Sequence, residues 1–174
     1  MAESSSTAAQ KAEAPASVNF AIMVVSTGVI AGTRQDRSGP IIKEKILASG
    51  HQVVDNAVVP DDATKIKQAV LGFIANRDIH AIVSTGGTGL TRSDVTYETV
   101  KALFTRELTG FTPLFMQFSY AQGGPACLLT RATAGVIGSV VLFALPGSPD
   151  ACAMALDSLV LPEIAHITKH LHDR

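Results

Sequence analysis

The feature that most constrains the fold of this chain is a glycine-rich segment at residues 81–98, which joins a strand pattern to a helix pattern. An apolar run at 81–83 predicts a buried strand, and a helix is expected to begin near Thr96. In α/β proteins a strand, a glycine loop and a helix N-terminus form an anion site, because backbone N–H groups point outward and the helix dipole favours negative charge. The glycines of this loop are Gly86, Gly87 and Gly89, with Thr88 between them.

The loop matches neither of two common nucleotide-binding patterns. The dinucleotide pattern G-x-G-x-x-G requires a glycine where this chain has Arg92, and the P-loop pattern requires Gly-Lys-Ser/Thr, which is absent. The loop carries a carboxylate instead, Asp94. The sequence therefore predicts a different kind of anion-binding loop.

Strand and helix patterns alternate along the rest of the chain, which predicts a three-layer α/β/α sandwich with a mostly parallel sheet. The last two strands flank Gly138 and are expected to form a hairpin-like pair. We expect Pro40 at the first position of a helix with Ile42, Ile46 and Leu47 on one face, and a break near Pro162. Predicted strands cover 20–25, 52–59, 81–83, 131–136 and 139–145, and predicted helices cover 40–49, 96–105, 112–121 and 149–171. A further helix is predicted after the turn at 60–62, with apolar residues at 66, 69, 70, 73 and 74 on one face.

Length and composition predict one folded domain. Residues 1–17 are rich in Ala, Ser, Glu and Lys and are expected to be a disordered tail, which leaves a single domain over 18–174. The two cysteines, Cys127 and Cys152, form no C-x-x-C pair and lie among apolar or small residues. They are expected to be buried thiols of a cytoplasmic protein rather than a disulfide or a metal pair.

The net charge of −1 argues against a nucleic-acid partner and against a strongly basic membrane surface. No run approaches the ~18 apolar residues that a membrane span needs. The N-terminus lacks the apolar segment of a signal peptide. These observations predict a cytoplasmic protein with neither a nucleic-acid nor a membrane partner.

Asp61 and Asp94 are the candidate catalytic residues. Each follows a predicted strand end, and about one βαβ unit separates them, so neighbouring parallel strands would bring both to one crevice. Mg²⁺ prefers carboxylate and phosphate oxygens, and two acids beside an anion loop suit a metal–nucleotide site. The alternative is that both residues are helix caps, since Asp is a favoured N-cap and Thr91-x-x-Asp94 is similar to a capping box.

Other polar segments are expected at the same edge of the sheet, because ligands of open α/β sheets bind beyond the carboxyl ends of the strands. Arg131 could clamp a phosphate or form a surface ion pair. His166 and His170 lie one helical turn apart, near His172; they could bind a metal or simply favour a helix C-terminus. Asp36, Ser38 and Gly39 could present hydroxyl and amide donors to a ligand, or form an ordinary loop with a Ser or Gly cap. The remaining candidate ligand-binding residues are Ser26, Thr130, Pro146, Gly147 and Ser148, where Ser148 is also a plausible N-cap.

These motifs resemble the MoaB/Mog family of molybdenum-cofactor biosynthesis proteins, which includes the N-terminal domain of gephyrin. The resemblance covers nearly all of residues 18–171. It is carried by STGGTGLT at 84–91 followed by Asp94-Val95-Thr96, by DRSGP at 36–40, VVPD at 58–61, Thr130-Arg131, and LPGSP at 145–149.

The resemblance implies a molybdopterin-binding fold that assembles as a homotrimer or homohexamer. It also implies adenylylation of molybdopterin with Mg²⁺ and ATP, release of pyrophosphate, and transfer of the product to a molybdate-insertion protein. Asp61 and Asp94 match the two essential acidic positions of the family, and Asp94 is the expected metal ligand. The loop at 86–89 matches its phosphate loop, while Thr130 and residues 146–148 match the cleft around the pterin. The alternative is a non-catalytic molybdopterin-binding or scaffold oligomer of the same fold.

Overall fold

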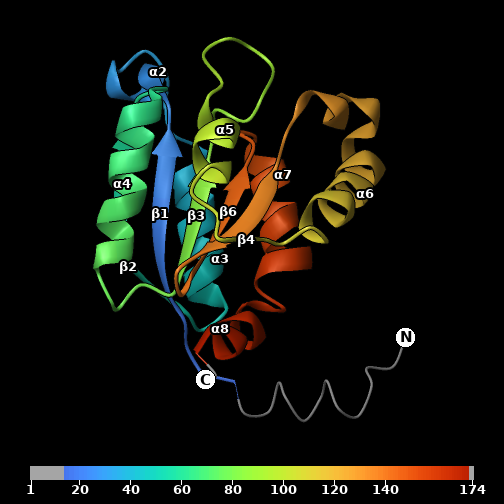
Figure 1. Ribbon diagram of the computed structural model, residues 1–174. Coiled ribbons are helices and arrows are strands. Elements are labelled where there is room, and N and C mark those ends of the chain that lie inside the picture. Colours follow the sequence, from blue (N-terminus) through green and yellow to red (C-terminus); the bar gives the residue numbers. More distant parts are fainter. Residues whose placement is uncertain (1–13, 173–174) are drawn as a thin grey trace.

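The computed structural model of the chain describes residues 14–172 (Figure 1). Most of the tail predicted over residues 1–17 lies outside the described residues. Within the described part, six strands form one sheet in the order β2-β1-β3-β6-β5-β4. Their bounds are β1 Asn19–Val25, β2 Gln52–Val59, β3 Ala81–Thr85, β4 Arg106–Glu107, β5 Thr133–Ile137 and β6 Val140–Leu145.

Strands β2, β1, β3 and β6 are parallel, whereas β5 and β4 are antiparallel to their neighbours. The mostly parallel sheet and the β5–β6 hairpin are therefore confirmed. Strand β4 was not predicted, because two residues are too few to show a period. The register places Thr85 beside Val24 on one side and Leu145 on the other, so the carboxyl ends of three strands meet at one edge.

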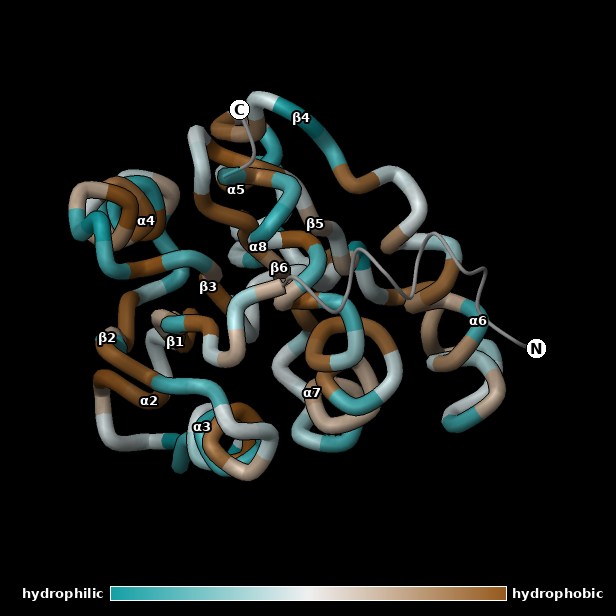
Figure 2. The backbone as a smooth tube through the Cα atoms, turned by 90° about the horizontal axis from the view of Figure 1, so that it is seen from below, coloured by the Kyte–Doolittle hydropathy of each residue, from teal (hydrophilic) through white to brown (hydrophobic). Residues whose placement is uncertain are grey.

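Helices cover both faces of the sheet, as the view along the strands shows (Figure 2). Helices α4 and α5 pack on one face, and α3, α7 and α8 on the other. The helical segments are α2 Thr27–Ile30, α3 Ser38–Ala48, α4 Ala63–Ala75, α5 Thr96–Lys101, α6 Phe111–Gly123, the 3₁₀ segment η1 Gly124–Leu129, α7 Pro149–Ala155, the π-helical segment η2 Leu156–Val160 and α8 Ile164–His172.

Strand β1 belongs to both hydrophobic cores because successive side chains of a strand point to opposite faces. Phe20 and Ile22 pack with α3 and α7, while Ala21 and Met23 pack with α4. Each of these side chains is almost completely buried. Full burial of a Phe, Ile or Met side chain contributes about 1.5–3 kcal/mol, so this strand is the common support of the two layers.

Two helix boundaries differ from the prediction. Helix α3 begins at Ser38 rather than at Pro40, because the Asp36 carboxylate accepts the N–H groups of the first two helical residues. Leu47 was expected on the buried face of α3, but 45% of its surface is exposed. Helix α5 ends at Lys101 instead of Thr105, because the backbone N–H of Thr105 already donates to Val136 of β5.

The C-terminal helical pattern breaks around Pro162, as predicted. Helix α7 with η2 and helix α8 meet at an angle of 58°. Among residues 14–172 no single helix is long and apolar enough to cross a membrane, and only this bent pair reaches that length and composition when taken together.

The histidines of α8 do not form a cluster of three metal ligands. His166 Nε2 lies 2.9 Å from His170 Nε2, and His166 Nδ1 lies 3.2 Å from a Glu163 carboxylate oxygen. His172 is bound to the carbonyl of Thr168 instead. No group of three or more His, Cys, Asp or Glu side chains that could hold a metal occurs in the described part of the chain.

Two other histidines accept hydrogen bonds from the backbone at the start of β1. The backbone N–H of Val18 donates to His51 Nδ1 (3.3 Å), and that of Asn19 donates to His80 Nδ1 (3.1 Å). Each acceptor nitrogen must be unprotonated for its hydrogen bond to exist. Burial lowers the pKa of His51, and burial together with the neighbouring His172 lowers the pKa of His80 more than Asp78 raises it.

We therefore expect the domain to lose stability as the pH falls below the ordinary histidine pKa of about 6.5. In that range the unfolded chain binds protons that the folded chain does not, so the free energy of unfolding decreases as the pH decreases. Thermal unfolding between pH 7.5 and 5.5 measures the effect, at about 2–4 °C per kcal/mol for a chain of this size. The variant His51→Asn/His80→Asn keeps an acceptor oxygen that does not titrate, and its unfolding temperature should vary less over this range. If the unfolding temperature varied equally with pH in the wild type and in this variant, the pH dependence would not come from His51 and His80.

Candidate active site

A cleft of about 1020 Å³ lies at the carboxyl ends of the parallel strands. It is lined by residues that follow β1, β2, β3 and β6, namely Ser26, Asp61, Gly86 and Pro146. The chain leaves β1 toward β2 on one side and later returns to β3 on the other, so the cleft opens where the order of the strands reverses. Open α/β sheets bind their ligands at such switch points.

The glycine loop after β3 is held against the end of β1. Gly86 and Gly87 have φ values of 98° and 66°, a region that residues with side chains rarely adopt. A Cβ on Gly86 would lie 2.3 Å from the carbonyl oxygen of Val25, and one on Gly87 would lie 2.3 Å from Thr96 Oγ1. Only glycine permits this approach of two backbones, which exposes the loop to the cleft.

Arg131 fixes the far end of the loop rather than pointing into the cleft. Its guanidinium donates to the carbonyl of Gly89 through Nε (3.0 Å) and Nη2 (2.6 Å), and to the carbonyl of Asp94 through Nη2 (2.9 Å). It also pairs with Glu98 and lies over the ring of Tyr97. The phosphate clamp considered from the sequence is therefore not the arrangement observed, because these donors are engaged with the loop.

Asp94 lies directly against the glycine loop. Its Oδ2 accepts hydrogen bonds from the backbone N–H (2.9 Å) and hydroxyl of Thr91. A Cβ on Gly89 would come within 2.8 Å of the same oxygen. Helix α5 has Val95 at its N-cap, so Asp94 does not cap this helix. The bond from the Thr91 N–H to its carboxylate is nonetheless the contact expected of the Thr91-x-x-Asp94 capping box. No hydrogen bond to Asp94 Oδ1 is found within residues 14–172.

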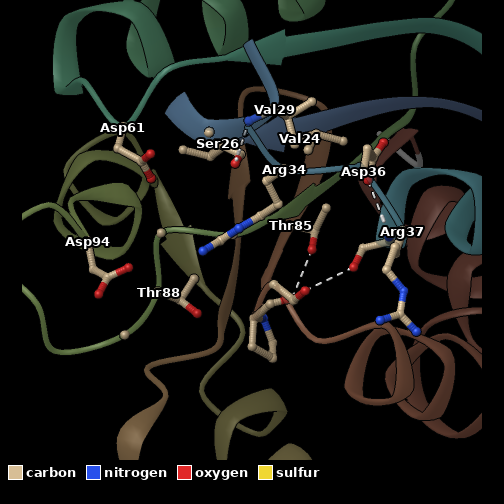
Figure 3. A pocket seen from close by; sticks show the side chains of 18 of the residues that line it. Val24, Ser26, Val29, Arg34, Asp36, Arg37, Asp61, Thr85, Thr88 and Asp94 are labelled. Atoms are coloured by element: carbon tan, nitrogen blue, oxygen red, sulfur yellow. Dashed lines mark hydrogen bonds between the residues drawn. The ribbon is translucent and has the colours of Figure 1, made fainter. Parts of the chain in front are cut away.

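Asp61 joins the ends of β1 and β2. Its Oδ2 accepts the backbone N–H of Thr27 at 2.8 Å, and its own N–H donates to the Thr27 hydroxyl at 3.0 Å. The N-cap of α4 is the next residue, Asp62, which accepts from Lys65. Asp61 therefore does not cap the helix that follows it. Its carboxylate lines the same cleft as Asp94 (Figure 3).

Hydrogen bonds also hold the wall of the cleft that includes Asp36, Ser38 and Gly147, here called the opposite wall. The hydroxyl of Ser38 donates to the carbonyl of Gly147 (3.0 Å), and the hydroxyl of Thr85 donates to that of Pro146 (2.8 Å). Ser148 accepts from Ala151 as the N-cap of α7, which confirms that predicted helix start.

Most residues singled out in the sequence meet in this cleft. Gly39, Arg131 and Ser148 do not line it: Gly39 packs against Asp36, and the other two hold loops in place. The lining residues that were predicted are Ser26, Asp36, Ser38, Asp61, Gly86, Gly87, Thr88, Gly89, Asp94, Thr130, Pro146 and Gly147.

The sequence missed other residues that line the cleft, notably Arg34, Arg37 and Leu129. Arg34 and Arg37 belong to the polar connection between α2 and α3, which has no period that would indicate the direction of a side chain. Leu129 ends the 3₁₀ segment η1. Gly124 and Pro125 at its start predict only that the preceding helix ends there.

Residues 21–166 match the protein family described as probable molybdopterin binding domain. The chain belongs to this family. It is 40% identical over 163 residues to molybdenum cofactor biosynthesis protein B of Bacillus cereus, covering 93% of this chain and 95% of that protein. It is 40% identical over 167 residues to the molybdopterin adenylyltransferase of Pyrococcus furiosus, covering 94% and 96%.

A solved structure with the same fold is that of the tungsten cofactor synthesizing protein MoaB from Pyrococcus furiosus. The two folds superpose with a TM-score of 0.84 at 40% identity, over 92% of this chain and all of that chain. The family inferred from the motifs and the molybdopterin-binding fold are therefore confirmed.

This family member contains no reactive thiol at the floor of its cleft. Cys127 and Cys152 are both free and buried, as predicted. Cys152 Sγ lies 3.3 Å from Thr85 Oγ1, below the cleft. Burial raises the pKa of the Cys152 thiol to about 11. It therefore stays protonated at neutral pH and packs as a small apolar side chain.

Replacement of Gly86 by alanine should disrupt the site. The positive φ alone costs about 1–3 kcal/mol for a residue with a side chain, and the contact with the carbonyl of Val25 adds to that. Urea unfolding measures the loss. Gly72→Ala is the matched control, because a Cβ there in helix α4 meets nothing within 4 Å. It should be neutral or stabilising by up to about 1 kcal/mol. Equal unfolding midpoints for the two variants would contradict this account of the loop.

Proposed function

We propose that this protein transfers the adenylyl group of Mg-ATP to molybdopterin and releases pyrophosphate. The observation that carries the proposal is the meeting of a glycine loop with the carboxylates of Asp61 and Asp94 in one cleft. The adenylyltransferase name of the Pyrococcus furiosus relative, at 40% identity over nearly the whole chain, supports the same reaction.

The two carboxylates have the oxygen donors that a magnesium ion prefers. Each has one oxygen, Oδ2, fixed by a backbone N–H, and Oδ1 of each has no hydrogen-bond partner among the described residues. Mg²⁺ is usually held by one or two carboxylates together with substrate phosphates and water. Asp94 and Asp61 would hold it, and the bound ion would neutralise phosphate charge.

The loop binds and orients the phosphates of the nucleotide. The N–H of Gly86 donates to the carbonyl of Leu145, whereas the N–H groups of residues 87–89 have no partner among the described residues and are the donors available to a phosphate. The hydroxyls of Thr88 and Thr130 lie 3.2 Å apart beside them. The pterin binds against the opposite wall, where Asp36, Ser38 and Gly147 line the cleft. Gly39, Arg131 and Ser148 keep these walls in place without touching the ligand.

The chemistry is an in-line exchange at the α-phosphorus of ATP. An oxygen of the terminal phosphate of molybdopterin forms a new bond to this phosphorus, while the bond from the phosphorus to the bridging oxygen of the β-phosphate breaks. Pyrophosphate leaves with that electron pair. The attacking phosphate is already an anion, so no general base is required. Such a transfer depends on positioning and on charge stabilisation, which loop amides and carboxylate-held Mg²⁺ supply.

We expect Asp94→Asn to reduce pyrophosphate release by at least about 100-fold, since it removes a charged metal ligand. The amide oxygen can still accept from Thr91, so the fold should persist. Asp62→Asn is the matched control: Asp62 lies outside the cleft lining, and Asn is an equally good N-cap. A rate for Asp94→Asn close to that of the wild type would contradict its role. If the wild type binds molybdopterin but releases no pyrophosphate from Mg-ATP, the protein is a non-catalytic binder or scaffold.

We further propose a homo-oligomer, trimer or hexamer, formed through α6 and η1, whose product passes to a molybdate-insertion protein. Apolar side chains are exposed along these two adjoining segments: Leu128 is 71% and Tyr120 is 62% exposed, and Leu114 and Phe118 are exposed as well. Such a concentration marks an interaction surface.

Leu128→Glu should therefore shift the protein to a smaller species in size-exclusion chromatography with light scattering. Leu71→Glu is the control, because Leu71 is exposed on α4 on a different face of the sheet. If neither variant alters the mass of the particle, this surface is not the interface.

A further inference from the structure

Arg34 is an exposed cation in the lining of the cleft, and residues 14–172 supply no partner for its charge. It lies in the connection between α2 and α3 and lines the cleft. Its side chain extends across the cleft toward Thr88, with Asp61 and Asp94 beyond it (Figure 3). Within residues 14–172 no hydrogen bond or ion pair to its guanidinium is found.

The absence of a side chain at Gly28 allows Arg34 to take this course. The carbonyl of Gly28 accepts the backbone N–H groups of Thr33 and Arg34, each at 3.0 Å. A Cβ on Gly28 would lie 3.3 Å from Cβ and 3.9 Å from Nε of Arg34. The stem of Arg34 therefore lies against bare backbone, and its guanidinium is directed into the cleft.

The other arginines near the cleft are placed differently. Arg131 gives its donors to the carbonyls of the glycine loop and to Glu98. Arg37 lines the cleft, but it lies beside Asp36 at the end away from Asp61 and Asp94 (Figure 3). Among the described residues that line the cleft, Arg34 is thus the cation between the carboxylate pair and the opposite wall.

A cation at this position would add to the stabilisation that Mg²⁺ and the loop amides provide, because the attacking group and the attacked group are both phosphates. Two unit charges 4 Å apart repel by about 1 kcal/mol in water and about 4 kcal/mol near a protein surface. This repulsion grows as the two groups approach bonding distance. A guanidinium presents two parallel N–H donors, which can hold one oxygen from each phosphate.

We propose that Arg34 bridges the terminal phosphate of molybdopterin and the α-phosphate of ATP and neutralises their repulsion as the new bond forms. The inference rests on the proposed adenylyl transfer and names the residue that makes its central step possible.

The test is steady-state kinetics of pyrophosphate release by wild type, Arg34→Ala and Arg34→Lys. Because neutralisation matters most in the transition state, Arg34→Ala should lose about 100-fold in kcat while KM for Mg-ATP changes by less than about threefold. Arg34→Lys should recover part of the rate, because lysine restores the charge without the planar fork. Arg77→Ala removes an exposed arginine that does not line the cleft and should match the wild type.

Gly28→Ala gives a second, independent line of evidence. The new methyl group would press on the stem of Arg34, so kcat should fall, by less than in Arg34→Ala. If the effect acts through Arg34, the double variant Gly28→Ala/Arg34→Ala should be no slower than Arg34→Ala alone. If the losses in kcat of the two single variants added up in the double variant, Gly28→Ala would not act through Arg34.

The outcomes separate this inference from the proposed function. A wild type that releases no pyrophosphate would overturn the adenylyl transfer itself. If the wild type is active but Arg34→Ala stays within about threefold in kcat, or loses only affinity for Mg-ATP, the bridging role of Arg34 is wrong and the proposed function stands.

Discussion

The close contact between the backbone of Gly86 and the carbonyl oxygen of Val25 is the constraint on which the rest of the site depends. It joins the carboxyl ends of β1 and β3, and it is possible only because Gly86 has no side chain and a positive φ. From this contact the loop turns over the edge of the sheet and reaches Asp94. A bulkier residue would separate the loop from the sheet and move the carboxylate with it.

Positioning and binding are divided between two kinds of side chain. Groups that do not line the cleft, such as Arg131 and Ser148, hold the loops in place through bonds inside the protein. Groups with an atom left unpaired, such as Asp61, Asp94 and Arg34, face the cleft. An unpaired charge retains its capacity to bind a ligand.

The sequence predicted the layers, the sheet and the convergence of the two aspartates, because apolar periodicity and strand-end placement determine these features. It could not predict the direction of individual side chains in loops. Of the two roles considered for Arg131, a phosphate clamp or a surface ion pair, the structure shows the ion pair, with Glu98, together with bonds to loop carbonyls. Arg34, in a polar connection without a period, reaches the cleft. Strand β4 escaped prediction because only two residues form it, and its pairing depends on distant Val136 and Gly135.

Segment η1 contributes to two different surfaces within a few residues. Ala126 and Leu129 form part of the rim of the cleft, and Leu128 between them projects into the exposed apolar surface. In the oligomer proposed above, a chain seated on Leu128 would restrict the motion of this rim, so less entropy would be lost when a ligand binds in the cleft.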